Sequence, residues 1–368
     1  MVNVCNDIFP LFRLEGPPIE AIYIERGHIN DSYAVICGDP ESSPAYVLQR
    51  INHKVFRDPG GLMENFARVT RHIRRRLEET SVKEIGRRVL FCLPAADGKD
   101  YAIDAEGRMW RASQFISRAQ SYDTIGSVEQ AWYCAEAFGR FQRMVRDLPG
   151  PRLNEVIPDF HDTPKRLKRL EEAAAKAPAG RLQDAAREIA FVRERTALAS
   201  TVVDALADGR VPERITHNDT KINNVMLDDE TGQGICVIDL DTVMPGSVLY
   251  DFGDMVRTAT SPASEDEADL SQVTLRLPYF EALVEGYLSQ ARDFLNDLEL
   301  KWLPLSGQLI TLTIGVRFLT DFLAGDVYFK TDADRPLHNL ERCRTQFRLI
   351  ECIEESMPEM HAIVKRMA

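Results

Sequence analysis

The sequence lacks the marks of several protein classes. Its seven cysteines are scattered, and none of them forms a CxxC pair, which argues against a disulfide framework or a thiolate zinc site. The first residues show no basic segment followed by an apolar stretch, so no signal peptide is predicted. No run of about 18 apolar residues occurs, so we expect no membrane-spanning segment and a cytoplasmic protein.

Positively charged residues are fewer than negatively charged ones. Lys and Arg number 45 against 57 Asp and Glu, which gives a net charge of −12. A local basic cluster, RHIRRRL at 71–77, has the spacing of a solvated helix face. An acidic chain without a larger basic region is not expected to bind nucleic acid, and composition leaves its oligomeric state open.

The pattern of apolar residues divides the 368-residue chain into two parts. Short strand-like segments separated by Gly, Asp, Pro and Ser occupy about 20–116, interrupted by one predicted helix over 61–79. From about 126 onward apolar residues recur every three or four positions, so helices dominate, the segment 180–206 among them. We therefore predict an α+β protein with a β-rich lobe over 1–116 and a helical lobe over 117–368.

Strand signals return in the helical part only around one polar hairpin, at 224–227 and 235–240. Its turn, DDETGQG, is rich in turn-forming residues. Asn224 and Asp239 are equidistant from the midpoint between Thr231 and Gly232, so a regular ladder places their Cβ atoms roughly 4.5–5.5 Å apart. Amide and carboxylate oxygens suit Mg²⁺, and the two residues are candidate ligands. A bulge would shift this register.

Two further polar residues precede the hairpin. Asp219 can reach the same space as Asn224, and a carboxylate beside a metal can orient a hydroxyl group and accept its proton. Lys221 can neutralise charge on a transferring phosphoryl group. Turn chemistry explains the asparagines singly, but it does not explain Asp219, Lys221 and Asp239 occurring together, so we favour phosphoryl transfer.

These residues carry a family resemblance. HNDTKINN (217–224) resembles the catalytic loop of the kinase-like phosphotransferases, and VIDLD (237–241) resembles their metal-binding strand end. That superfamily includes aminoglycoside phosphotransferases, choline kinases and, more distantly, protein kinases. The sequence is most similar to the N-acetylhexosamine 1-kinases, through those two segments and GHINDSY (27–33), YVLQRIN (46–52), IPDFHDT (157–163), YDFGD (250–254) and HNLERCRTQ (338–346).

The resemblance implies a bilobal protein-kinase-like fold whose small lobe is an antiparallel sheet, with ATP as co-substrate and Mg²⁺ as cofactor. It implies Asp219 as the catalytic base and Asn224 and Asp239 as metal ligands, with His217 bracing the loop. Asn218 stands where the antibiotic kinases commonly have glycine, which argues against an aminoglycoside acceptor.

The resemblance also implies a nucleotide site in the small lobe. Gly27 and Asn30 belong to the turn expected to cover the phosphates, although that turn is poor in glycine. Arg50 replaces the usual phosphate-binding lysine, and it can pair with phosphates as a planar fork. Glu64 would be the ion-pair partner of Arg50.

The acceptor site is expected on the apolar helix within 309–329. Arg317 and Asp321 are spaced as a structural ion pair, but with Tyr328 they are also candidate contacts for a sugar. The resemblance implies phosphorylation of the anomeric hydroxyl of N-acetylglucosamine or N-acetylgalactosamine. The alternatives are a kinase of another sugar, of a choline-like alcohol or of an aminoglycoside, and a non-catalytic nucleotide-binding pseudokinase.

A literal DFG at 251–253 offers a competing metal carboxylate. The segment PGSVLYDFGD is typical of a loop that runs into a helix, so we expect Asp251 to cap that helix or to brace the catalytic loop through backbone N–H groups. Asp241 is a candidate for a supporting carboxylate or for a second metal.

Overall fold

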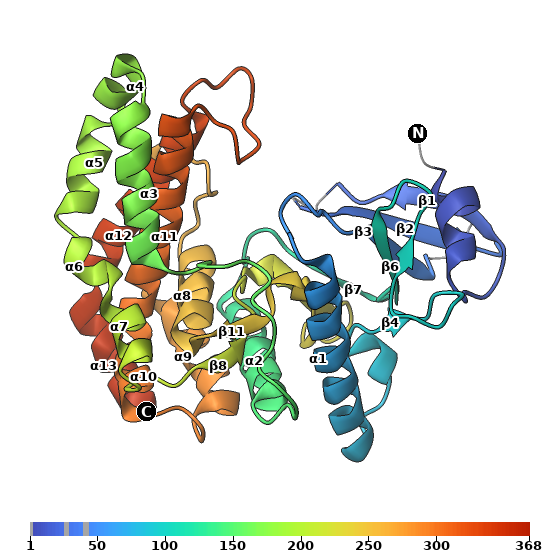
Figure 1. Ribbon diagram of the computed structural model, residues 1–368. Coiled ribbons are helices and arrows are strands. Elements are labelled where there is room, and N and C mark those ends of the chain that lie inside the picture. The colour runs from blue at the N-terminus through green and yellow to red at the C-terminus, as the bar shows by residue number, and fades with distance from the viewer. Residues whose placement is uncertain (1–2, 26–28, 40–43) are drawn as a thin grey trace. The chain divides into compact units, whose positions relative to one another are not determined.

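The computed structural model describes residues 3–25, 29–39 and 44–368 (Figure 1). The chain forms two compact units. The first comprises 1–120, 144–158 and 225–245, and the second comprises 121–143, 159–224 and 246–368. The first boundary is close to the expected end of the small lobe at 116. Segments 144–158 and 225–245, expected in the helical lobe, belong instead to the first unit.

An antiparallel sheet forms the centre of the first unit. Its strands follow the order β1-β2-β3-β6-β4, with β5 beside β6, and all its ladders are antiparallel. The expected α+β class with an antiparallel small lobe is thereby confirmed. The strands are β1 (Pro18–Tyr23), β2 (Asp31–Cys37), β3 (Tyr46–Arg50), β4 (Cys92–Leu93), β5 (Ala102–Ile103) and β6 (Met109–Gln114).

One face of this sheet is buried under the N-terminal segment. Val35, Leu48 and Trp110 from three different strands pack with Ile8 and Phe9. Ile8 and Phe9 come from two short helical turns, at Val4–Ile8 and Phe9–Leu11. Alternation along β2 and β3 places these apolar side chains on a common face, which is why the segment can cover the sheet.

Helix α1 (Pro59–Glu79) begins at Asp58, whose Oδ1 accepts the Gly61 N–H at 2.9 Å. The Asn65 side chain of α1 donates to the carbonyls of Asn154 and Val243 at 2.8 and 3.0 Å. These bonds attach 144–158 and 225–245 to the first unit. The arginines at 71, 74 and 75 are exposed on α1, as expected of a solvated helix face.

A second small sheet contains the polar hairpin. Strands β7 (Ala119–Gln120), β9 (Val225–Asp228) and β10 (Gly234–Val237) pair in the order β10-β9-β7. Gly234 lies opposite Leu227, whereas Val237 lies opposite Val225, because the register shifts between Gly234 and Cys236. The expected regular register is therefore wrong: the ladder ends at Val225 and Val237, and Asn224 and Asp239 are not a cross-strand pair.

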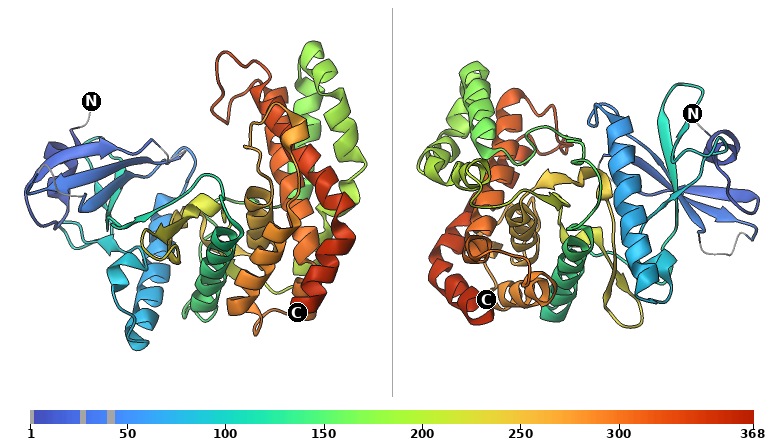
Figure 2. Two further views of the ribbon diagram at one scale, coloured as in Figure 1. Left: turned by 180° about the vertical axis from the view of Figure 1, so that it is seen from behind. Right: turned by 60° about the horizontal axis from the view of Figure 1, so that its bottom comes forward.

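The second unit is helical, and Figures 1 and 2 show α11 lying alongside α3 and α12. Gly253 of α8 permits close packing against α11, because a Cβ atom there would lie 2.3 Å from the Ser306 carbonyl oxygen. The helices are α2 (Val128–Val145), α3 (Thr163–Lys176), α4 (Ala179–Asp184), α5 (Ala186–Arg193), α6 (Thr196–Ala199), α7 (Thr201–Ala207), α8 (Val248–Ala259), α9 (Leu277–Ala291), α10 (Asp297–Lys301), α11 (Leu303–Ala324), α12 (His338–Glu355) and α13 (Met357–Met367).

Helix α11 is the one helix of the described residues that is long and apolar enough to cross a membrane, but most of it is buried within the second unit. The single helix predicted over 180–206 is wrong, since this stretch forms the four short helices α4 to α7. Two short strands, β8 (Arg214–Thr216) and β11 (Met244–Gly246), complete the strands of the described residues.

Candidate active site

The catalytic-loop segment follows β8 and turns sharply at Asn218. This residue has a φ of 65°, a left-handed conformation that asparagine tolerates better than most residues other than glycine. Its side chain supports the turn, because Oδ1 accepts the Thr216 hydroxyl at 3.0 Å and Nδ2 donates to the Thr216 carbonyl at 3.2 Å. The position that glycine commonly occupies in the antibiotic kinases is thus a backbone turn, which asparagine can also form.

Asp251 braces this loop from α8. Its carboxylate accepts the backbone N–H groups of His217 and Asn218 at 2.9 and 2.7 Å, and the Gln142 side-chain amide at 2.7 Å. The N-cap of α8 is Ser247, so of the two expected roles the loop brace is confirmed. Burial raises the pKa of Asp251, whereas His217 and the three donated bonds oppose that shift.

His217 lies against α2. It is fully buried, and the rings of Phe138 and Phe141 contact it edge-on with centroids 5.6 and 5.8 Å away. The loop is therefore anchored by its backbone through Asp251 and by this aromatic packing. The expected bracing position of His217 agrees with these contacts.

The structure brings Asp219, Lys221 and Asn224 together. Lys221 Nζ lies 3.6 Å from Asp219 Oδ1, and Asn224 Nδ2 donates to the Asp219 carbonyl and carboxylate at 2.8 and 3.2 Å. Burial alone would raise the pKa of Asp219, but Lys221, His217 and other donors outweigh it and hold that pKa below its ordinary value. Asp219 raises the pKa of Lys221 in turn. Asp219 is therefore an ionised carboxylate beside an ammonium group.

Asp239 and Asp241 lie in the first unit, directly after β10. Asp239 has a φ of 58° at the start of a short helical turn at Leu240–Thr242, so the chain leaves the strand at this residue. The Asp241 carboxylate is buried, and it accepts bonds from Arg111 and from the Asn30 side chain. Both contacts compete with a metal ion, so we retain Asp241 only as a supporting carboxylate.

The donor set can be compared with what Mg²⁺ requires. Among the residues that the structure describes, no cluster of three or more His, Cys, Asp or Glu side chains is arranged to hold a metal. Mg²⁺ needs few protein ligands, since water and phosphate oxygens complete its shell. The Asn224 amide nitrogen is occupied by Asp219, which leaves the amide oxygen as the ligand atom. Asn224 lies in the second unit and Asp239 in the first, and each carries an oxygen atom of the kind that Mg²⁺ binds.

Of the residues expected to bind the nucleotide, Asn30 and Arg50 lie at the paired ends of β2 and β3, and Glu64 lies on α1. Gly27 lies outside the described residues. Asn30 donates to Asp241, and its Oδ1 accepts the Asn52 N–H at 2.9 Å, so its amide links the start of β2 to Asp241 and to the end of β3. Arg50 forms its ion pair with Asp31, which lies directly opposite it on β2.

The expected ion pair between Arg50 and Glu64 is wrong. Glu64 lies 3.8 Å from Arg68, one turn further along α1, and accepts a bond from Asn154 at 3.2 Å. Directly opposed residues on neighbouring strands lie close together. Asp31 is opposite Arg50, so its carboxylate is the nearer partner for the guanidinium.

The three candidate acceptor residues are brought together at the C-terminal end of α11. Asp321 accepts the backbone N–H groups of Val327 and Tyr328 at 3.0 and 2.8 Å, and Asn339 donates to it at 2.9 Å. Asp321 therefore shapes the loop that carries Tyr328, and it does not form the structural ion pair with Arg317 that was the alternative.

Arg317 lies among aromatic rings. Its guanidinium carbon is 5.4 Å from the ring centroids of both Phe160 and Phe329 and 5.8 Å from that of Tyr328, distances suited to cation–π interaction. Within the described part of the chain, no carboxylate lies within ion-pair distance of this guanidinium. Arg317 and Tyr328 are thus adjacent, and Tyr328 is 58% exposed.

No role was expected for His161, yet it contacts both the loop at Asn218 and the ring of Phe160, which lies near Arg317. Its Nε2 lies 2.9 Å from the Asn218 carbonyl oxygen, and the Phe160 ring contacts it at 4.6 Å between centroids. The charges of Arg317 and Asp219 both affect its pKa. In the sequence His161 is a single histidine in the motif IPDFHDT, and nothing besides that motif indicates its contact with Asn218.

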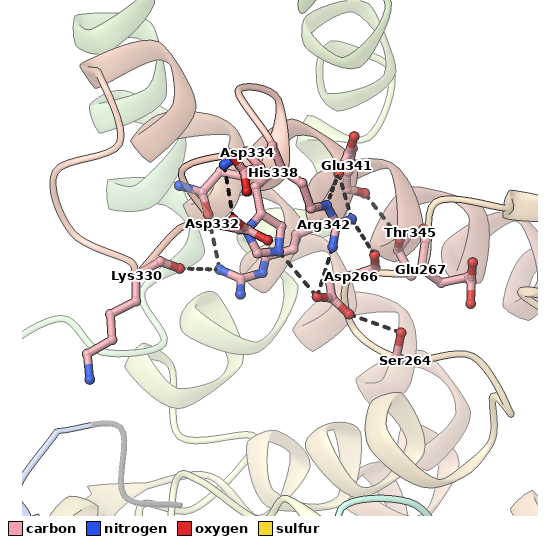
Figure 3. A network of polar contacts seen from close by, with 12 residues as sticks. Ser264, Asp266, Glu267, Lys330, Asp332, Asp334, His338, Glu341, Arg342 and Thr345 are labelled. Atoms are coloured by element: carbon pink, nitrogen blue, oxygen red, sulfur yellow. Dashed lines mark hydrogen bonds and ion pairs between the residues drawn. The ribbon is translucent and has the colours of Figure 1, made fainter. Parts of the chain in front are cut away.

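A polar network fixes the loop that follows Tyr328 (Figure 3). His338 accepts the Asp332 N–H at 3.0 Å and contacts Asp266 at 3.2 Å. Arg335 pairs with Asp266 and Glu341 at 3.2 and 2.6 Å. Thr345 donates to the Glu267 carbonyl at 2.8 Å. Hydrogen bonds and ion pairs therefore connect the loop to α12 and to the segment before α9. These contacts help to fix the position of Tyr328.

Residues 20–293 match the phosphotransferase enzyme family, and the chain belongs to that family.

Solved structures of similar fold include three phosphotransferases. An aminoglycoside phosphotransferase from Alicyclobacillus acidocaldarius has a TM-score of 0.58 at 13% identity, with 94% of this chain and 92% of that chain covered. A choline kinase from Cryptosporidium parvum has a TM-score of 0.56 at 14% identity, with the same coverage. An AMP-bound spectinomycin phosphotransferase has a TM-score of 0.53 at 14% identity, covering 92% and 94%. Likeness at this level of identity shows the fold.

Proposed function

We propose that the protein transfers the γ-phosphoryl group of ATP to the anomeric hydroxyl of N-acetylglucosamine or N-acetylgalactosamine. Membership of the phosphotransferase family supports the reaction type, and nucleotide-bound relatives of the same fold support ATP as the donor. We expect the enzyme to act in the cytoplasm. The amino sugar is the finer part of the proposal, and it rests on the charge around Arg317.

The positive charge around Arg317 is the reason for proposing a neutral acceptor. Burial, followed by the nearby guanidinium groups of Arg317 and Arg169, lowers the pKa of Arg166 to about 10. Two arginines thus repel each other across one region, and in the described ranges no carboxylate lies within ion-pair distance of Arg317. A cationic acceptor such as choline or an aminoglycoside would add repulsion here. A neutral sugar offers hydroxyl and carbonyl oxygens, which guanidinium groups bind as donors.

The catalytic residues have defined parts in this reaction. Asp219 is ionised, so it can orient the sugar hydroxyl and accept its proton as the new P–O bond forms. Lys221 would face the transferring phosphoryl group and offset its developing charge. Asn224 and Asp239 would hold Mg²⁺, whose charge would offset that of the phosphate oxygens. The protein contributes mainly position and electrostatics, as phosphoryl transfer requires.

The nucleotide would be bound by residues of the first unit. Arg50 can offer the N–H groups of its planar fork that do not bind Asp31 to phosphate oxygens, and Gly27 belongs to the turn expected to cover them. Asn30 would contribute by positioning that turn, and Glu64 would contribute by positioning α1. Arg317 and Tyr328 would contact the sugar, with Asp321 holding their loop.

One pair of acceptors tests this proposal sharply. N-acetylglucosamine and glucosamine differ only in the acetyl group, and glucosamine carries a positive charge when its amine is protonated. We expect ADP release to depend on N-acetylglucosamine and to fall strongly with glucosamine. The Arg317→Met variant keeps most of the side-chain length without the charge, so it should narrow that difference. A choline or glucosamine preference would favour the amine-kinase alternative, and ATP binding without transfer to any acceptor would favour a pseudokinase.

A further inference from the structure

A buried histidine contacts the catalytic loop. His161 is 7% exposed, and its ring lies against Tyr250 with centroids 4.9 Å apart and against Phe160 at 4.6 Å. Its Nε2 is 2.9 Å from the carbonyl oxygen of Asn218, the residue before Asp219. Both residues lie in the second unit, so the bond belongs to a single compact body.

The chemistry of this contact fixes the tautomer. A carbonyl oxygen only accepts, so Nε2 must carry the proton and donate it. Nδ1 is buried and has no hydrogen-bond partner in the described structure. Burial, together with Arg317 and Arg166, lowers the pKa of His161 to about 3, against the Asn218 bond and Asp219, which raise it. The ring is therefore a neutral Nε2–H donor at neutral pH.

The Asn218 peptide is held from two directions. Its N–H is bound by Asp251 at 2.7 Å, and its carbonyl is bound by His161. Between them lies a φ of 65°, which side chains other than glycine seldom adopt without local support. A change in this residue would turn the following peptide and thereby redirect the Asp219 side chain.

We propose that His161 is a positioning residue: its Nε2–H bond to Asn218 sets the backbone conformation that directs Asp219 at the acceptor hydroxyl. The inference rests on the proposed function, because the direction of Asp219 affects the rate only if Asp219 acts on that hydroxyl. It adds a residue that works through the backbone and contacts neither substrate.

Two variants separate the donor from the bulk of the ring. His161→Phe keeps an aromatic ring against Phe160 and Tyr250 but removes the N–H, whereas His161→Gln offers an amide N–H at similar reach. We expect His161→Phe to lower kcat by roughly 10- to 100-fold, in line with small misplacements of a catalytic group, with the KM for ATP within about twofold. His161→Gln should recover most of the loss.

The control is His72→Phe, because His72 is also 7% exposed but lies in the first unit. We expect it to leave kcat unchanged. Equal losses of kcat in folded His161→Phe and His161→Gln, or a normal kcat in folded His161→Phe, would overturn the proposal.

Two measurements test the inference without an activity assay. Nitrogen-15 NMR of the wild-type protein should show His161 neutral and protonated on Nε2 from pH 5.5 to 8. Hydrogen exchange of 216–221 should be faster in His161→Phe than in wild type and His161→Gln. A charged or Nδ1-protonated ring, or unchanged exchange, would overturn the inference even if no variant were active. Absence of acceptor-dependent ADP release in the wild type would instead count against the proposed function.

Discussion

Replacing Asp251 by alanine tests whether this residue braces the loop or binds the metal. The carboxylate receives three hydrogen bonds, from the backbone N–H groups of His217 and Asn218 and from Gln142, and it is 1% exposed. Alanine would leave all three donors buried without their partner. A buried donor left unsatisfied costs roughly 1–3 kcal/mol, or about 3–9 kcal/mol for three. Removing the carboxylate also removes the cost of burying its charge, so we expect a net loss of about 3–5 kcal/mol.

Such a loss is large for a protein whose total stability is typically about 5–15 kcal/mol. It should lower the unfolding midpoint by roughly 6–20 °C, on the usual scale for domains of about 200 residues. Asp251→Asn should lie between alanine and wild type, because it keeps one acceptor oxygen. Differential scanning calorimetry would measure the shift, with saturating nucleotide added in a second scan.

The matching variant is Asp239→Ala. We expect it to abolish the part of ATP affinity that depends on Mg²⁺, measured by calorimetric titration with and without the metal. The Asp251→Ala variant should keep that dependence at a temperature where it is folded. If Asp251→Ala kept the wild-type midpoint and lost the Mg²⁺ dependence, the DFG carboxylate would be the metal ligand and the reasoning would be refuted.

Three further outcomes are expected. Asp219→Asn should lower kcat by about 10²- to 10⁴-fold, as for loss of a general base, while ATP affinity survives; near-normal turnover would remove Asp219 from the mechanism. Because the pKa of Asp219 lies below its ordinary value, its ionised form persists as pH falls, and kcat should show no Asp219 limb between pH 8 and about 5; a limb centred near 6 would contradict this. Arg317→Ala should lower kcat/KM for the sugar by roughly 10- to 100-fold through loss of a charged donor, with the KM for ATP nearly unchanged; equal losses for both substrates would place Arg317 outside the sugar site.

The sequence predicted the parts of the fold that depend on periodicity and turn chemistry. Alternating strands followed by three- and four-residue spacing gave the order of sheet and helices. The helix-start pattern of PGSVLYDFGD led to the bracing role of Asp251, which is confirmed by its bonds to His217 and Asn218.

Features that depend on one residue of register could not be predicted in the same way. A shift between Gly234 and Cys236 moves Asn224 and Asp239 out of the expected pairing, and nothing in the turn composition marks it. The partner of Arg50 was misassigned to Glu64, although antiparallel pairing of β2 with β3 places Asp31 opposite. His161 depends on tertiary contact with a loop 57 residues away, which no local pattern records.

The measurement that tests the central claim most directly is the position of phosphate on the product. The protein would be incubated with Mg²⁺, ATP and N-acetylglucosamine, with Asp219→Asn as the matched control, and the product examined by ¹H and ³¹P NMR. We predict a single sugar phosphate whose phosphorus couples to the anomeric proton, formed by the wild type and nearly absent with the control. Phosphate on another hydroxyl, or phosphorylation of choline in preference to the sugar, would contradict the account.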